Sequence, residues 1–179
     1  DTGALMCDTG VFTGRSPKDR FIVKDEKTQG AVWWGDINIP FTPEKFDLLY
    51  NKMMGFLSDK KVYVRDAYAG ADKTHRLRVR VINTLAWHNL FCFNMFLRPE
   101  KYKLESFDPN FTIICVPEFE ADPEMDGTRQ KNFAVVNFTK RMILIGGTGY
   151  SGEMKKGIFS VLNYILPHEE NVLSMHCSA

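Results

Sequence analysis

A glycine-rich segment between an apolar run and an amphipathic run most constrains how this chain can fold. Residues 146–157 read GGTGYSGEMKKG; they follow the apolar run 142–145 and precede helix-like spacing of apolar residues over 154–166. This order predicts a strand, a tight turn and a helix. Backbone N–H groups at such a helix N-terminus can bind an anion, and Lys155 and Lys156 add positive charge beside them.

This glycine-rich segment does not match the Walker A loop that binds nucleotide phosphates. Gly147 and Gly152 have the spacing of that motif, but Glu153 and Met154 stand where Lys and then Ser or Thr are required. The residues alone leave two interpretations open. The turn is either an anion or substrate site of another kind, or an ordinary strand-to-helix loop with a solvated lysine pair.

Composition predicts a soluble globular domain. Apolar residues make up 44% and charged residues 25% of the 179 residues, which are values typical of folded proteins of one domain. The net charge of +1 argues against a general binder of nucleic acid or of membrane surfaces. No apolar run approaches the roughly 20 residues of a membrane span. The four cysteines are widely scattered and form no CxxC pair, which favours free thiols and a cytoplasmic location. They are Cys7, Cys92, Cys115 and Cys177.

Both ends of the sequence are unusual for a complete domain. The chain begins without a methionine and runs directly into the strand-like residues 4–7, and it stops within the strand-like residues 172–179. Domain boundaries usually fall in polar, exposed segments. We therefore expect the sequence to be a piece of a longer protein.

Strand-like and helix-like patterns alternate between these ends. A first helix is expected after Thr42 and Pro43, a second from Asn83 or Thr84, and a third that ends at Pro167. The residues between 117 and 130 are acidic and rich in turn formers, which favours a long surface loop. Strands are predicted at 4–7, 21–23, 32–34, 61–66, 76–81, 111–116, 133–138 and 142–145. The fold class is therefore α/β, with a mixed β-sheet flanked by helices.

Two further segments could bind an anion. Residues 13–20, TGRSPKDR, form a charged Gly/Pro turn in which Arg15 suits two-point binding of a carboxylate or phosphate. A solvated turn is the simpler interpretation from composition. In the second, Arg76, Arg78 and Arg80 share one face of a predicted strand, for which a polar or salt-bridged sheet face is the simpler explanation, since any half-buried strand shows such alternation.

Tyr150 and His176 complete the candidate residues. Tyr150 lies in the glycine-rich turn beside the lysine pair, and His176 lies in an apolar strand-like run. A lone histidine in such a run is more often a hydrogen-bonded core residue than a ligand. The residues by themselves therefore indicate an anion-binding α/β domain.

Several segments, in order along nearly the whole chain, resemble the ATP-dependent phosphoenolpyruvate carboxykinase family. Because the matches are long and in register, they are more specific than one short motif. The charged turn is similar to the ATP-using branch and not to the GTP-using branch. The segments are TGVFTGRSPKDRF at 9–21, VRDAY at 64–68, NMFLRP at 94–99, LIGGTGYSGEMKKG at 144–157 and SMHCSA at 174–179.

The resemblance implies the conversion of oxaloacetate and ATP to phosphoenolpyruvate, carbon dioxide and ADP, a step of gluconeogenesis that uses Mn²⁺ and Mg²⁺. By motif, Arg15 would bind the substrate carboxylate, and Tyr150 would orient the substrate or carbon dioxide. Lys155 would face the transferred phosphoryl group. Lys156 and His176 would bind Mn²⁺ and contact phosphate, and Lys156 would also contact the substrate.

The resemblance also implies that the functional groups are divided between two domains. The family has an ATP-binding P-loop, a metal-binding aspartate and a further arginine beyond the segment that ends in HCSA. Residues 1–179 would then form the N-terminal, substrate-side domain, with the nucleotide-binding domain after residue 179. The alternative is a free-standing domain that holds a dicarboxylate through Arg15 and the glycine-rich turn without catalysis. The sequence sets no oligomeric state.

Overall fold

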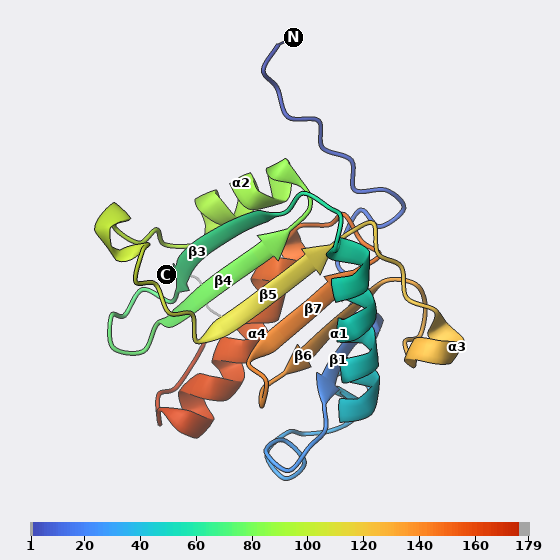
Figure 1. Ribbon diagram of the computed structural model, residues 1–179. Helices are drawn as coiled ribbons and strands as arrows, with labels where there is room; N and C mark the ends of the chain where they lie inside the picture. The colour runs from blue at the N-terminus through green and yellow to red at the C-terminus, as the bar shows by residue number, and fades with distance from the viewer. Residues whose placement is uncertain (1, 176–179) are drawn as a thin grey trace.

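Seven strands form one mixed β-sheet at the centre of the computed structural model, which describes residues 2–175 (Figure 1). From one edge to the other the strand order is β2-β1-β6-β7-β5-β4-β3. The predicted fold class, an α/β domain with helices on a mixed sheet, is confirmed. The strands are β1 (Arg20–Val23), β2 (Ile39–Phe41), β3 (Tyr63–Ala69), β4 (Leu77–Asn83), β5 (Phe111–Val116), β6 (Phe133–Asn137) and β7 (Met142–Gly146).

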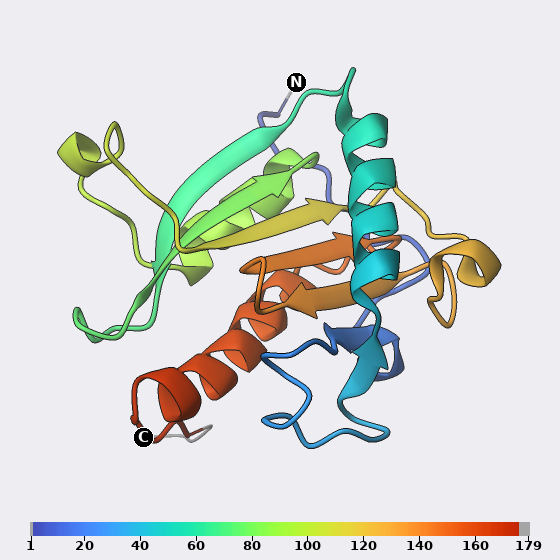
Figure 2. The same ribbon diagram turned by 60° about the horizontal axis from the view of Figure 1, so that its bottom comes forward.

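Helices cover both faces of the sheet. α1 (Pro43–Leu57) lies on one face, and α2 (Ala86–Met95) and α4 (Gly152–Glu169) lie on the other (Figures 1 and 2). Thr42 caps α1 as predicted, because its hydroxyl accepts a hydrogen bond from the N–H of Lys45. The short elements are η1 (Pro17–Asp19), η2 (Lys101–Lys103) and α3 (Pro123–Asp126).

Each face of the sheet has its own hydrophobic core. The α1 face is filled by Phe46, Leu49 and Met53, which are fully buried against apolar residues of the central strands. On the opposite face α4 places the predicted apolar stripe against the sheet, and burial of these side chains from water holds the helix in place. The predicted stripe consists of Met154, Ile158, Val161, Leu162 and Ile165, of which Leu162 is only partly buried.

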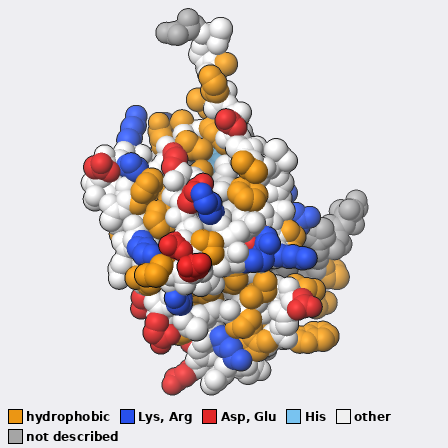
Figure 3. Space-filling view, turned by 90° about the vertical axis from the view of Figure 1, so that its right-hand side faces the viewer, with side chains coloured by type: hydrophobic (Ala, Val, Ile, Leu, Met, Phe, Trp, Pro, Cys, Tyr) orange, Lys and Arg blue, Asp and Glu red, His pale blue; other side chains and the backbone are white. Residues whose placement is uncertain are grey.

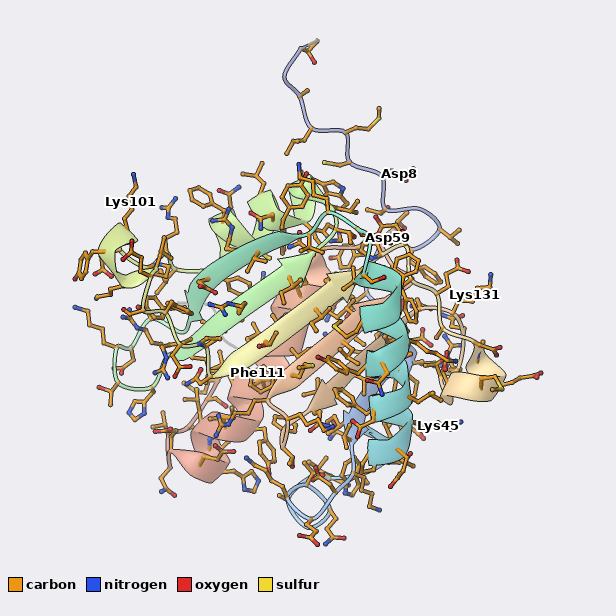
Figure 4. The ribbon with its side chains drawn as sticks, viewed as in Figure 1. Asp8, Lys45, Asp59, Lys101, Phe111 and Lys131 are labelled. Carbon is orange, nitrogen blue, oxygen red and sulfur yellow. The ribbon has the colours of Figure 1, made fainter. Side chains whose placement is uncertain are left out.

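Strand directions bring several connections to one edge of the sheet. β4, β5 and β7 are parallel to one another, β6 is antiparallel to β7, and β1 is parallel to β6. β4, β5 and β7 therefore end where β1 and β6 begin, and we call this side the carboxyl edge. α2 and α4 start there, since they follow β4 and β7 after short connections. Figure 4 shows Phe111 at the opposite side, where β5 starts, and Asp8 toward the carboxyl edge.

Two predicted strands, residues 4–7 and 32–34, are wrong, since neither pairs with a neighbouring strand. The described part of the strand-like run at the end of the sequence, 172–175, is not a strand either. Trp33 is 92% exposed, and the indole N–H of Trp34 donates to the carbonyl oxygen of Gln29 in a turn. β2 occupies the edge beside β1 instead. Apolar residues form a strand only where a neighbouring backbone can pair with them.

The predicted helix boundaries shift by a few residues. α2 begins at Ala86, because Asn83 is still the last residue of β4 and pairs with Cys115 of β5. α4 continues past Pro167, and the N–H of Glu170 bonds to the carbonyl oxygen of Ile165. A proline costs less in a last turn than in a helix interior, since few hydrogen bonds remain to be lost. The predicted loop 117–130 contains the single turn of α3.

The surface carries charges of both signs. Figure 3 shows Lys and Arg side chains interspersed with Asp and Glu on the face that it displays. Within residues 2–175 no helix combines the length and the apolar character that crossing a membrane requires.

Candidate functional site

The glycine-rich turn joins β7 to α4 at the carboxyl edge. Gly147 has a φ of +67°, a left-handed conformation that glycine adopts without strain. The N–H of Tyr150 then donates to the hydroxyl of Thr148 at 3.1 Å. Ser151 precedes the helix without a side-chain cap. The predicted strand, turn and helix are all present, and the positive end of the α4 dipole is at the turn.

The ring of Tyr150 is held against the start of α4. A Cβ atom at position 152 would lie 2.5 Å from Cε1 of Tyr150 and 2.9 Å from its hydroxyl oxygen, so only glycine leaves room for the ring. The side chain is half-buried. Tyr150 therefore presents its hydroxyl at the N-terminus of α4.

Glu153 connects this helix start to the turn that carries Arg15. Its side chain is 3% exposed; Oε1 accepts a hydrogen bond from the N–H of Ser16, and Oε2 accepts one from Nε of Arg20, both at 3.0 Å. Arg15 is exposed and has no acidic partner among residues 2–175. The structure thus brings the charged turn, Tyr150 and the start of α4 together. Nothing in the sequence marks Glu153 as the residue that connects them.

Asp19 provides a second anchor for the charged turn. Its carboxylate is buried and accepts hydrogen bonds from Nε and Nη2 of Arg129 and from Nε2 of Gln130, each at 2.8 Å. The segment from Ser16 to Arg20 is therefore held by two buried acids, Glu153 of α4 and its own Asp19. A turn with such anchors is more than the solvated loop that composition favoured.

The two lysines of α4 face a different region. Lys155 is exposed and Lys156 half-buried, and both border a surface hollow of about 370 Å³ between α4, the end of β3 and the end of α2. Nζ of Lys156 lies 5.2 Å from the ring centroid of Phe159. On the other flank of α4, residues 17–18 and 20–22 border a second hollow of about 190 Å³. His176 lies outside the described residues.

The described residues contain no cluster of metal-ligating side chains. No three side chains of His, Cys, Asp or Glu in residues 2–175 gather closely enough to hold a metal ion. Of the two expected ligands of Mn²⁺, Lys156 is therefore the one that the structure describes. Lys156 has no acidic partner among these residues, and it lines the hollow beside α4.

Arg78 and Arg80 of β4, and Arg76 just before it, belong to a polar, salt-bridged sheet face. Arg80 binds Asp66 through two hydrogen bonds, of 2.7 and 2.8 Å, and this pairing raises the pKa of Arg80. Arg76 stacks on the ring of Tyr68, with the guanidinium carbon 3.6 Å from the ring centroid. The simpler of the two interpretations of this strand is thus confirmed.

A buried histidine under the glycine-rich turn was not predicted. His88 of α2 is fully buried, and its Nε2 lies 2.8 Å from the carbonyl oxygen of Gly149. Burial lowers the pKa of His88, so the ring is neutral near neutral pH. The only sequence signal was a histidine at the start of a helix, which gives no indication of its partner.

Comparison with known proteins finds relatives along the whole chain. A family model described as phosphoenolpyruvate carboxykinase matches residues 1–179. The chain is 64% identical over 178 residues to a phosphoenolpyruvate carboxykinase (ATP) of Flavobacterium johnsoniae, and 63% identical over 178 residues to one of Christiangramia forsetii. A third, from Geobacillus kaustophilus, is 50% identical over 179 residues. Each alignment covers 99% of this chain, which spans about a third of the length of these relatives (33% or 34%).

Proposed function

The chain belongs to the ATP-dependent phosphoenolpyruvate carboxykinase family, and on that premise we propose that it forms the substrate-side part of an enzyme that acts on oxaloacetate and ATP. The products would be phosphoenolpyruvate, carbon dioxide and ADP, in a step of gluconeogenesis. The main support is the match over residues 1–179. The proposal places the nucleotide-binding P-loop domain in the part of the relatives that this chain does not span.

The proposed reaction has two steps. The carbon–carbon bond to the departing carboxylate of oxaloacetate breaks, which releases carbon dioxide and leaves the enolate of pyruvate. The enolate oxygen then forms a bond to the γ-phosphorus of ATP, and the bond between that phosphorus and the β,γ-bridging oxygen breaks to give ADP. Such transfers depend on positioning and on charge stabilisation, and the protein itself forms no covalent bond.

The residues of the chain supply positioning and positive charge in this scheme. Arg15 would bind a substrate carboxylate, which is supported by its exposure and by the lack of an acidic partner among residues 2–175. Tyr150 would orient the substrate at the start of α4. Lys155 and Lys156 would stabilise negative charge on the phosphoryl oxygens and the substrate.

Lys156 and His176 would hold Mn²⁺, and Mg²⁺ would accompany ATP. When bound, Mn²⁺ would stabilise charge on the enolate oxygen. A lysine can bind a metal ion only through its neutral amine, whereas a guanidinium has no comparable lone pair to donate. This difference separates a ligand from a lysine that contacts the substrate by charge alone.

The Lys156→Arg variant of the full-length source protein tests the proposal. We expect weaker Mn²⁺ binding, by at least about tenfold, and lower turnover, since losing even an outer partner of a ligand costs that much. Mn²⁺ binding is followed by electron paramagnetic resonance, independently of activity. Lys140→Arg is the matched control, because Lys140 lies in the β6–β7 turn and pairs with Asp47. Unchanged Mn²⁺ affinity in Lys156→Arg would rule out Lys156 as a ligand.

Residues 1–179 produced alone test whether the reaction needs the proposed nucleotide-binding domain. We expect no phosphoenolpyruvate from oxaloacetate, ATP, Mg²⁺ and Mn²⁺, because these residues contain no Walker A motif. One missing arginine already costs about 10³–10⁵ in rate in some phosphoryl transfers. Product above a control without protein would refute this part of the proposal. A full-length source protein that binds oxaloacetate but forms no product would favour the free-standing binding domain.

A further inference from the structure

A buried chain of hydrogen-bonding groups lies directly beneath the glycine-rich turn. The imidazole of His88 is fully buried in the first turn of α2. Its Nε2 lies 2.8 Å from the carbonyl oxygen of Gly149, and its Nδ1 lies 3.6 Å from Sγ of Cys115. Gly149 immediately precedes Tyr150. The chain therefore runs from β5 through α2 to the peptide that carries the proposed substrate contact.

Chemistry fixes the direction of these hydrogen bonds. A carbonyl oxygen can only accept, so Nε2 of His88 carries the hydrogen and donates it to Gly149. Nδ1 is then free to accept the hydrogen of the Cys115 thiol. Burial lowers the pKa of His88 and raises that of Cys115 well above its ordinary range, so both groups are neutral, as this arrangement requires.

The opposite side of Gly149 is also in contact with protein. A Cβ atom at this position would lie 2.8 Å from Cα of Thr9 and 2.9 Å from the carbonyl oxygen of Asp8. The backbone of residues 8–9 thus passes directly over the turn, and Asp8 can be followed in Figure 4. Gly149 is held between this backbone and the imidazole of His88, which leaves its peptide little freedom to rotate.

We propose that His88 is a positioning residue, which orients the peptide between Gly149 and Tyr150 through the hydrogen bond from Nε2 to the Gly149 carbonyl oxygen. The effect of His88 on catalysis rests on the proposed function, whereas its effect on the conformation of the turn does not. If the 149–150 peptide rotates, the Tyr150 ring leaves its place over Gly152. A displacement of about 1 Å in a positioning group can cost on the order of 100-fold in rate.

Two substitutions of His88 separate the hydrogen bond from the packing. The His88→Gln variant keeps an N–H donor at nearly the same distance from the backbone, whereas His88→Leu fills much of the volume and cannot donate. In the full-length source protein we expect kcat/KM for oxaloacetate to fall about 10- to 100-fold in His88→Leu and no more than about threefold in His88→Gln. The matched control is Cys92→Ala, in the same helix, whose buried Sγ contacts Sδ of Met154 and not the turn.

A structural readout accompanies the kinetics. Hydrogen exchange of the amides in the glycine-rich turn should accelerate in His88→Leu and stay unchanged in His88→Gln and Cys92→Ala. In the unmodified protein, ¹⁵N nuclear magnetic resonance of the imidazole should find the hydrogen on Nε2. This last measurement needs no variant, so it decides the matter even if His88→Leu fails to fold.

The outcomes are distinct. Rescue by glutamine together with the Nε2–H tautomer supports the proposal. An Nδ1–H tautomer, equal losses in the leucine and glutamine variants, or unchanged turn exchange in His88→Leu would each overturn it. If the unmodified full-length protein forms no phosphoenolpyruvate, the proposed function fails, and the tautomer and exchange measurements still test the positioning of the turn.

Discussion

Replacing Glu153 by glutamine should separate the charged turn from α4. Glu153 accepts two hydrogen bonds, from the N–H of Ser16 and from Nε of Arg20, in a nearly fully buried position. Glutamine keeps one accepting oxygen, but its NH₂ group must face a donor. A hydrogen bond to a charged group contributes roughly 1.5–3 kcal/mol, and Arg20 is 25% exposed, which favours the middle of that range. We expect a loss of about 2 kcal/mol in the free energy of unfolding.

Urea unfolding followed by circular dichroism measures this loss. Glu120→Gln is the matched control, because Glu120 is 55% exposed and pairs with the exposed Lys131; no measurable change is expected there. In an Arg20→Met background Glu153→Gln should cost about half as much, since one of the two donors is gone. An equal loss in both backgrounds would refute the assigned role of the Arg20–Glu153 contact.

Two other perturbations follow from the site. Gly152→Ala introduces a Cβ atom 2.5 Å from the Tyr150 ring and should displace it, so steady-state kinetics of the full-length protein should show kcat/KM reduced at least about tenfold. An unchanged kcat/KM would show that the position of the ring is unimportant. His88 has a folded-state pKa below its ordinary value of 6.5, so the unfolded chain takes up the proton first as pH falls. The free energy of unfolding should therefore decrease below about pH 6.5 by at most about 1.4 kcal/mol per pH unit. Urea midpoints measured against pH should lose this part of their pH dependence in His88→Gln, and an unchanged pH dependence in that variant would contradict the assignment.

The sequence predicts the elements around the glycine-rich turn well, because their signals are local. Periodicity identifies the apolar stripe of α4, and the glycines mark the turn before it. Thr42 and Pro43 mark the start of α1 in the same way. Where a strand depends on a distant neighbour, as at residues 32–34, apolar content alone is misleading. The strand that pairs with β1 at this edge is Ile39–Phe41, which was not among the predicted strands.

The connections within the site could not be predicted from the sequence. Ser16 and Glu153 are 137 residues apart, and His88 and Gly149 are 61 residues apart. Such pairs form because β4 and β7 end at the edge where β1 begins, which depends on the strand order and directions of the whole sheet. An acid in the first turn of a helix is explained locally by the helix dipole, so Glu153 gave no sign of a second role.

Pairing of charges around the turn leaves Arg15 distinct from the other arginines there. Arg20 is bound by Glu153, and Arg129 by Asp19, whose carboxylates are both nearly fully buried. These two contacts hold the turn in place and at the same time neutralise the neighbouring guanidinium groups. Within residues 2–175 Arg15 has no such acid, so binding an anionic group would not first require breaking an ion pair. The acids therefore anchor the loop, and they leave Arg15 as the arginine of the turn whose charge is available to a ligand.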